Sequence, residues 1–235
     1  MPKVAKQQLG LLYATDIAIL ARKQRGQQQI FLTPYTLSAP NLHPLITALP
    51  MPQAMDQIIF LPRPLSGKAL HQMITQQALF WFGLPATELN FDYQLNMHAK
   101  QAILYVCACQ KAFAKKIVKD HQQKSWNPSA ITTLSHALYR LLRWMYGKYT
   151  APFGFYYSDE NYSYWLVLQE QIWLQLQIIP NLKRHTPPPL QPWLEDTLAQ
   201  NKLKNLQVIS AAELADKIKL TPAQLPAAGA AIWNY

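Results

Sequence analysis

The chain has 235 residues, of which 50% are hydrophobic and 14% are charged, with 22 Lys and Arg against 12 Asp and Glu. The apolar content excludes an intrinsically disordered protein, and the length allows one large domain or two small lobes, each with its own core. The net charge of +10 favours an anionic partner, namely nucleic acid, an anionic membrane surface or an acidic protein. The alternative is a basic surface that has no such partner.

At the N-terminus, two strands are predicted over residues 8–21 and 29–37, with the polar segment 22–28 as the turn between them. Asp16 interrupts the first apolar run, so this run is typical of a core strand rather than of a signal peptide. Residues 38–57 are rich in proline and lack periodicity, which predicts a surface connector. No apolar run approaches the roughly 18 residues of a membrane span, so we expect a cytoplasmic location.

The central part of the chain has the most regular pattern. Ser66 is predicted to cap a helix that ends at Gly83. Residues 89–95 alternate apolar and polar side chains, as in a half-buried strand, and residues 102–109 form a continuous apolar run, typical of a strand covered on both faces. Residues 111–119 then place apolar side chains on one side and lysines on the other, which predicts an amphipathic helix lying on this hairpin.

In the second half of the chain, helical spacing of leucines predicts a helix over residues 129–146. Three consecutive strands are predicted over residues 153–157, 162–168 and 171–179. Ser210 and Glu213 have the spacing of a capping box at the start of a helix over residues 210–217. Together, these elements predict an α+β or α/β protein with two lobes.

No metal site or catalytic constellation is evident in the sequence. Cys107 and Cys109 lie two residues apart in a predicted strand, and the chain has no further cysteine to complete a four-ligand site. We therefore expect both to be reduced core residues. The six histidines are scattered, without the i, i+4 spacing of a helical metal site.

Three segments carry a resemblance to a known family. Residues 80–109 combine a helix end, a Gly-Leu-Pro turn, a Phe-Asp-Tyr strand and an apolar strand that leads into a basic helix. Residues 129–132 and 137–140 match a family segment in which an apolar strand precedes an Ala-Leu-x-Arg helix. Residues 227–232 match the closing helix, with its alanine and glycine run. In these segments the chain resembles the PilM family of type IV pilus assembly proteins, in particular its shorter ComA-like and HofM-like members.

This resemblance implies an actin-like fold related to the cell-division protein FtsA, with two RNase H-like lobes. The first lobe would cover residues 1–149 and contain an inserted subdomain at about 50–122, and a second, shortened lobe would cover residues 150–235. It also implies a cytoplasmic protein, peripheral to the inner membrane, that binds the short N-terminal tail of a PilN-like inner-membrane protein. Many members of the family bind ATP between the lobes.

The nucleotide site is where the sequence departs from the family. Actin-like ATPases hold phosphates on two hairpins with Asp-x-Gly, because glycine lets backbone N–H groups approach the phosphates and the Asp organises Mg²⁺. The vestigial positions here are Thr15 and Asp16 in the first hairpin and Ser158 and Asp159 in the second, and neither has the glycine. The two aspartates are relics of such a site or ordinary turn residues. We therefore expect no catalysis and no cofactor; the alternative is an actin-like ATPase with an atypical site.

Aromatic residues are concentrated around the predicted insert. As a set, they would line a groove between the insert and the first lobe that receives an extended partner peptide. The alternative for each residue is that its side chain fills the hydrophobic core. They are Phe80, Trp81, Phe82, Phe91, Tyr93, Tyr105 and Trp126.

Basic residues cluster between positions 111 and 143. They form a solvated helix face or contact anionic lipid headgroups; single-stranded DNA is a rival partner, but no recognised nucleic-acid motif is present. They are Lys111, Lys115, Lys116, Lys119, Arg140 and Arg143.

These observations and the resemblance predict a non-catalytic scaffold of a type IV pilus or DNA-uptake (competence) machine that binds a PilN-like tail. The first alternative is a basic module in competence that binds nucleic acid or a membrane surface. The second is the actin-like ATPase with an atypical site. The sequence does not predict an oligomeric state.

Overall fold

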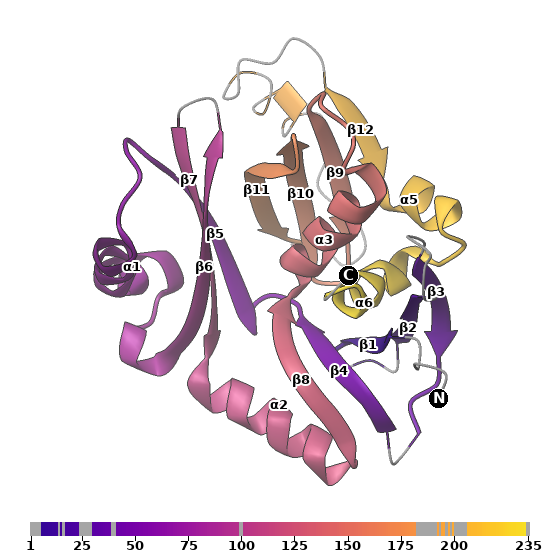
Figure 1. Cartoon of the computed structure of the whole chain (residues 1–235). Helices are drawn as coiled ribbons and strands as arrows, with labels where there is room; N and C mark the ends of the chain where they lie inside the picture. The colour runs from indigo at the N-terminus through magenta and orange to yellow at the C-terminus, as the bar shows by residue number, and fades with distance from the viewer. Residues whose placement is uncertain are drawn as a thin grey trace.

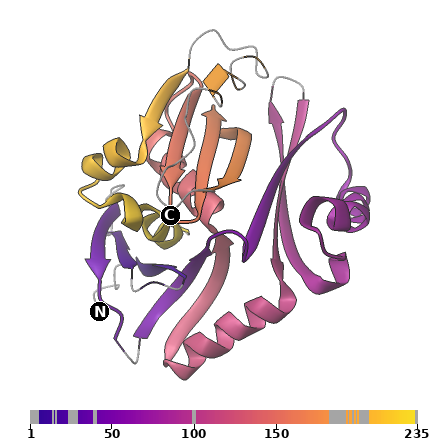
Figure 2. The same cartoon turned by 180° about the vertical axis from the view of Figure 1, so that it is seen from behind.

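The structure is a computed structural model that describes residues 6–13, 15, 17–23, 30–38, 41–98, 101–181, 192, 194–195, 197, 199 and 206–233. These residues form three sheets, with helices between and around them (Figures 1 and 2). Among the helices in this part of the chain, none is long and apolar enough to cross a membrane. Asp16 and most of the predicted turn at 22–28 lie outside the described residues.

The first sheet has five strands in the spatial order β3-β2-β1-β4-β8. They are β1 (Lys6–Leu12), β2 (Ala18–Lys23), β3 (Ile30–Tyr35), β4 (Asn41–Leu49) and β8 (Trp126–Thr133). β1, β2 and β3 form an antiparallel meander, and β4 and β8 extend the sheet in parallel from β1. The single strand predicted over residues 8–21 is wrong, because the chain turns between β1 and β2, where the Thr15 hydroxyl donates to the Leu12 carbonyl oxygen at 2.7 Å.

Two further predictions for this sheet are also wrong. The proline-rich connector predicted over residues 38–57 contains all of β4, whose Leu45 and Ile46 are fully buried. The helix predicted over residues 129–146 is strand β8 followed by helix α3 (Leu134–Tyr146). The β-branched run before Leu134 favours a strand, and Thr133 then caps α3 by accepting a hydrogen bond from the His136 backbone N–H at 3.0 Å. The order of strand and helix that the family resemblance implied is confirmed.

A second, three-stranded sheet lies between β4 and β8 in the sequence, in the spatial order β5-β7-β6. Its strands are β5 (Ala54–Leu61), β6 (Leu89–His98) and β7 (Gln101–Gln110), and helix α1 (Gly67–Phe82) and the short 3₁₀ helix η1 (Ala86–Glu88) connect β5 to β6. We call this sheet with α1 the insert. The helix is capped by Ser66 and ends at Gly83, in the left-handed region at φ 69°, as predicted.

The central strand of the insert, β7, is covered on both faces, as its continuous apolar run predicted. Leu104 and Val106 face α1, whereas Ile103 and Tyr105 pack against the rest of the molecule. Helix α2 (Lys111–Gln123) is amphipathic as predicted, but its predicted position on the hairpin is wrong. It lies along β8 instead and buries Ile117, because α1 already occupies the outer face of the hairpin (Figures 1 and 2).

The third sheet repeats the topology of the first on a smaller scale, in the order β11-β10-β9-β12. Its strands are β9 (Phe153–Ser158), β10 (Tyr162–Gln169), β11 (Ile172–Pro180) and β12 (Gln207–Ser210). β9, β10 and β11 form an antiparallel meander and confirm the three predicted strands, and β12 pairs in parallel with β9 as β4 does with β1. Among the described residues this sheet has no counterpart of β8. Helix α5 (Ala211–Lys217) follows β12, and its capping box is confirmed.

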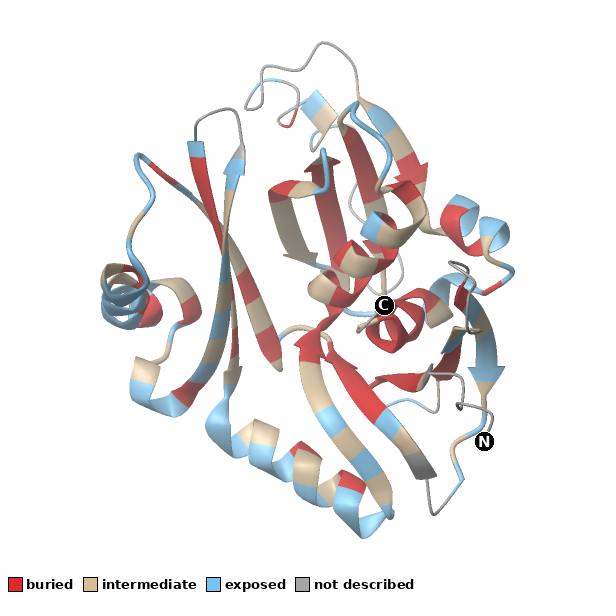
Figure 3. Cartoon of the chain, viewed as in Figure 1, coloured by how far each residue is buried: buried red, intermediate tan, exposed pale blue. Residues whose placement is uncertain are grey.

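The closing helix α6 (Leu225–Ala231), which follows the 3₁₀ helix η2 (Pro222–Gln224), returns to the first sheet. Its backbone packs directly against the backbones of β1 and α3. A Cβ at Gly10 would overlap the carbonyl oxygen of Ala227, and a Cβ at Gly229 would overlap the carbonyl oxygen of Ala137. α3 and α6 therefore lie between the first and third sheets, and one core joins all of these elements (Figure 3). The part of the chain after residue 150 is thus not confined to a second lobe.

The contact of α6 with α3 predicts a stability effect. Gly229→Ala should lower the free energy of unfolding by about 1–3 kcal/mol, because the added methyl group meets backbone atoms that cannot rotate away. Urea denaturation of the purified protein measures this change. The matched control is Gly67→Ala, where a Cβ meets nothing within 4 Å; it should leave stability unchanged or slightly raised. Equal effects of the two substitutions would contradict the tight packing of α6.

Candidate functional site

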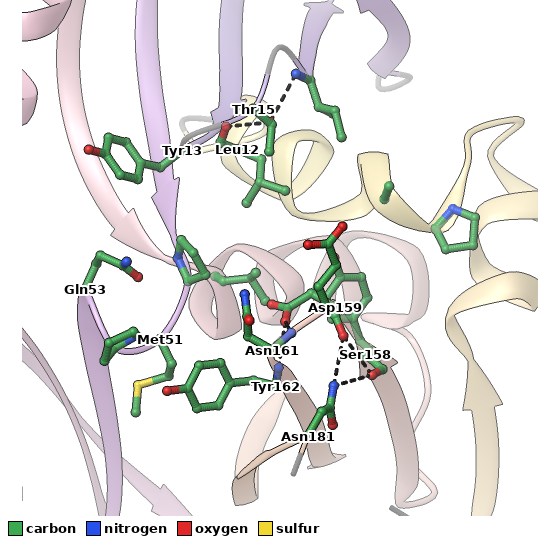
Figure 4. A pocket seen from close by; sticks show the side chains of 18 of the residues that line it. Leu12, Tyr13, Thr15, Met51, Gln53, Ser158, Asp159, Asn161, Tyr162 and Asn181 are labelled. Carbon is green, nitrogen blue, oxygen red and sulfur yellow. Dashed lines mark hydrogen bonds between the residues drawn. The ribbon is translucent and has the colours of Figure 1, made fainter. Parts of the chain in front are cut away.

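A cavity of about 1180 Å³ lies between the first and third sheets. The turn after β1, the segment between β4 and β5, and the β9–β10 turn line it, together with residues around β11 and η2. Four residues were predicted as vestigial nucleotide-site positions, and three of them, Thr15, Ser158 and Asp159, line this cleft (Figure 4). The fourth, Asp16, lies outside the described residues.

The β9–β10 turn satisfies its own polar groups. One oxygen of the Asp159 carboxylate accepts hydrogen bonds from the backbone N–H groups of Asn161 and Tyr162, at 2.8 and 2.7 Å (Figure 4). The Asn181 amide donates to the Ser158 hydroxyl at 3.2 Å and to the Asp159 carbonyl oxygen at 2.9 Å. Two backbone N–H groups of this turn are therefore already paired with a carboxylate.

The walls of the cleft are acidic and tyrosine-rich. The described lining residues include Asp159 and Glu160 but no Lys, Arg or Gly. Burial raises the pKa of Tyr157 and of Tyr164 well above their ordinary value, so both hydroxyls are neutral. The Tyr164 hydroxyl accepts a hydrogen bond from the Met51 backbone N–H at 3.3 Å, which ties the β4–β5 segment to β10. Elsewhere in the described chain, too, no group of three or more His, Cys, Asp or Glu could hold a metal ion.

A second concave region runs along the junction of the insert with β8 and α3. It consists of two cavities, of about 330 and 200 Å³, that share Asp92 and Cys107. We call the two cavities together the insert groove. The larger one, the arginine pocket, is lined by Asp92, Tyr93, Gln94, Tyr105, Cys107, His136, Tyr139, Arg140 and Arg143. The smaller one, the apolar pocket, is lined by Ala54, Asn90, Phe91, Asp92, Cys107, Ala108, Cys109, Ala114, Ile131, Thr132 and Thr133.

A buried carboxylate beneath the groove joins the insert to helix α3. Asp56 of β5 accepts hydrogen bonds from the hydroxyls of Tyr105 in β7 and Ser135 in α3. Burial raises the pKa of Asp56 from its ordinary value of 3.8 to about 6, although the hydrogen bonds from Ser135, Tyr105 and Thr133 oppose that rise. The carboxyl is therefore held by groups from both sides of the junction.

An aromatic stack forms the floor of the arginine pocket. The Trp173 ring stacks between those of Tyr105 and Tyr139, with centroid distances of 4.8 Å to each. His136 lies against this stack, and burial, with Arg140 and Arg143 nearby, lowers the pKa of its imidazole to about 3, so it is neutral. The guanidinium carbon of Arg140 lies 3.1 Å from the ring centroid of Trp233, near the C-terminus.

The seven aromatic residues predicted for the groove do not lie together. Trp81, Phe82, Phe91 and Tyr93 pack in the layer between α1 and its sheet, so most of their ring surface faces the interior of the insert. Phe80 projects from the outer face of α1 and is 85% exposed. The grouping is therefore wrong: residues alternate along β6, and the side chains of Phe91 and Tyr93 point toward α1.

Tyr105 and Trp126 lie elsewhere. Tyr105 is on the opposite face of the insert sheet, where it lines the arginine pocket. Trp126 is at the start of β8. Its ring contacts the imidazole ring of His121, and the Lys124 ammonium group lies over it. Of the seven predicted residues, Phe91, Tyr93 and Tyr105 therefore border the insert groove.

The six predicted basic residues separate into two groups. Lys111, Lys115, Lys116 and Lys119 are exposed on α2, whereas Arg140 and Arg143 lie on α3 in the arginine pocket. Sequence inspection missed Asp56, Trp173 and Trp233 as site residues. The sequence does show Asp56 as a single acidic residue within an apolar segment, but that segment was predicted as a connector.

In sequence, no family model and no curated protein matches the chain. Among solved structures it is similar to one described as the PilM–PilN type IV pilus biogenesis complex, with a TM-score of 0.62 and 12% identity over 95% of this chain and 90% of that chain. A Bacteroides thetaiotaomicron protein with an actin-like ATPase fold and unknown function gives a TM-score of 0.47 and 9% identity over 92% of this chain and 90% of that chain.

The cytoplasmic domain of EpsL, an inner-membrane component of the type II secretion system of Vibrio cholerae, gives a TM-score of 0.46 and 9% identity over 87% of this chain and 82% of that chain. The first of these three likenesses extends over nearly all of both chains and shows the fold. The chain has an α+β, actin-like fold with an inserted three-stranded sheet, as the family resemblance implied.

The raised pKa of Asp56 predicts a pH dependence of stability. The folded protein holds the proton more tightly than the unfolded chain, so this carboxyl stabilises the fold fully below its ordinary pKa of 3.8, and the contribution is lost as the pH rises through about 6. Asp56→Asn removes the titration. The unfolding free energy of the wild type relative to this variant should fall by up to about 3 kcal/mol between pH 4 and 7. Urea denaturation at several pH values measures it, and a constant difference would contradict the assignment.

Proposed function

We propose that the chain is a non-catalytic scaffold of a type IV pilus or DNA-uptake machine, peripheral to the inner membrane, that binds the N-terminal cytoplasmic tail of a PilN-like protein. The observation that carries this proposal is the likeness to the PilM–PilN complex, which extends over 95% of this chain and therefore includes the insert. The sequence resemblance to the PilM family points the same way and rests on separate evidence, namely short segments of the chain.

The insert groove supports the binding of an extended tail. Consecutive residues of β6, from Asn90 to Gln94, line its two cavities. β6 is also an edge strand of the insert sheet, so its outer backbone groups have no partner strand in that sheet. An extended peptide can pair with such an edge while its side chains enter neighbouring pockets. The groove offers an apolar pocket at one end and a charged one at the other.

The cleft between the sheets supports the absence of catalysis. A phosphate group binds where backbone N–H groups and cations are available. At the β9–β10 turn the Asp159 carboxylate already accepts two of these N–H groups and adds a negative charge where phosphates would lie. With Glu160 beside it and no basic or glycine residue in the described lining, the residues present do not fit a bound nucleotide.

A second role is contact with the membrane surface. The four exposed lysines of α2 lie on one helix that projects at the edge of the molecule (Figure 3). Such a helix suits anionic headgroups beneath the inner membrane. Because Arg140 and Arg143 lie apart from these lysines, the basic groups do not form the continuous track that a nucleic-acid strand would require.

The groove proposal predicts the effect of blocking the apolar pocket. A synthetic peptide of the partner's cytoplasmic tail should bind the wild type with low micromolar affinity in moderate salt. Ala114→Trp should weaken binding at least about tenfold, because the indole fills the pocket that Ala114 lines. Ala112→Trp on the exposed side of the same helix is the matched control and should bind like the wild type. Isothermal titration calorimetry measures the affinities, and unchanged binding by Ala114→Trp would refute this site.

The cleft proposal predicts that the purified protein shows no saturable micromolar binding of Mg·ATP. The physical reason is the repulsion of phosphate by Asp159 and Glu160 together with the pairing of the turn's N–H groups. Calorimetric titration with Mg·ATP tests this, with a known actin-like ATPase as positive control. Saturable binding at micromolar concentration would establish the ATPase alternative instead.

A further inference from the structure

The arginine pocket contains a guanidinium nitrogen without a hydrogen-bond partner. Nη1 of Arg140 is buried, and no described group accepts a hydrogen bond from it. The neighbouring Arg143 donates from Nη2 to a neutral acceptor, the Gln171 side-chain oxygen, at 3.2 Å. A buried donor on a charged group is costly when it is unpaired, and the penalty disappears when a ligand supplies the acceptor.

The contact with Trp233 helps to fix the position of Arg140. Its guanidinium lies over the Trp233 ring, and burial lowers the pKa of the group to about 10. The group remains charged at neutral pH. The contact with Trp233 is made over the face of its ring, and Nη1 of Arg140 remains available to an acceptor such as a carboxylate oxygen.

The charges around the pocket favour an anion with a single charge. Arg140 and Arg143 contribute two positive charges and Asp92 one negative charge. His136 and Cys107 contribute none, because burial lowers the pKa of the imidazole to about 3 and raises that of the thiol to about 12. The pocket therefore has a net charge of +1, which suits a carboxylate with one negative charge. A phosphate dianion fits less well, because the Asp92 carboxylate would repel its second negative charge. The pocket volume of about 330 Å³ admits a carboxylate-bearing side chain.

We infer that the arginine pocket binds a carboxylate, and that in the assembled machine this carboxylate belongs to an acidic residue of the tail lying in the insert groove. The identity of the donor rests on the proposed function; the carboxylate site itself does not. Because the arginine pocket and the apolar pocket share the wall formed by Asp92 and Cys107, one extended segment reaches both. The acidic residue would thus fix the register of the tail along β6.

The first test uses acetate on the full chain, labelled with ¹⁵N and observed by NMR at constant ionic strength. The indole N–H signal of Trp233 should shift saturably at millimolar acetate, and inorganic phosphate should bind more weakly. Arg143→Gln and Arg140→Gln should each remove the saturable shift. Lys148→Gln removes the same charge from an exposed position just after α3 and should leave the shift intact. A linear shift, tighter binding of phosphate, or no effect of Arg143→Gln would overturn the site.

The second test uses the tail peptide and a version in which each acidic residue is replaced by its amide. The wild type should bind the amide version about tenfold more weakly, and Arg143→Gln should bind both versions equally. If Arg143→Gln binds the native peptide as tightly as the wild type does, the inference is wrong while the proposed function stands. If acetate binds as described but no tail peptide binds, the carboxylate site stands and the proposed function is wrong.

Discussion

The packing of α6 against β1 and α3 determines how the first and third sheets lie relative to each other. Gly10 and Gly229 let the backbones of these elements approach so closely that no Cβ fits between them. Since α3 and α6 together separate the first and third sheets, their spacing sets the width of the cleft and the position of the α3 side chains. Both candidate sites are thus built on the same packing, and the C-terminal residues hold Arg140 in place through Trp233.

The two concave regions differ in how far their polar groups are already satisfied. In the cleft, Asp159 and Asn181 pair the groups of the β9–β10 turn within the protein, so little is left to recognise a ligand. In the insert groove, β6 is an edge strand of its sheet, and Nη1 of Arg140 has no hydrogen-bond partner among the described residues. Buried polar groups in a stable protein are normally paired. The groove is therefore where a partner has most to contribute, and the cleft where it has least.

The sequence predicted those elements whose pattern is local. The alternation in β6, the apolar run of β7 and the capping box at Ser210 each reflect forces between near neighbours, and all three are confirmed. The errors arose where contacts between residues far apart in the sequence determine the structure. The sequence of β4 is typical of a connector, but β4 is a buried strand because it pairs with β1 and β8. The lining of the groove depends on which face of the insert sheet packs against α3. The predicted aromatic set therefore mixed residues from both faces of this sheet. Asp56 was missed because the segment that forms β5 was predicted as a connector.

We propose that the chain binds an extended tail in the insert groove rather than a nucleotide in the cleft. The most direct measurement is NMR mapping of the tail peptide on the ¹⁵N-labelled full chain. Binding in the groove should give saturable shifts along β6 at residues 90–94 and in α3 around Arg140, with the β9–β10 turn unchanged. Shifts centred on Ser158 to Asn161, or on the exposed face of α1 around Phe80, would contradict it.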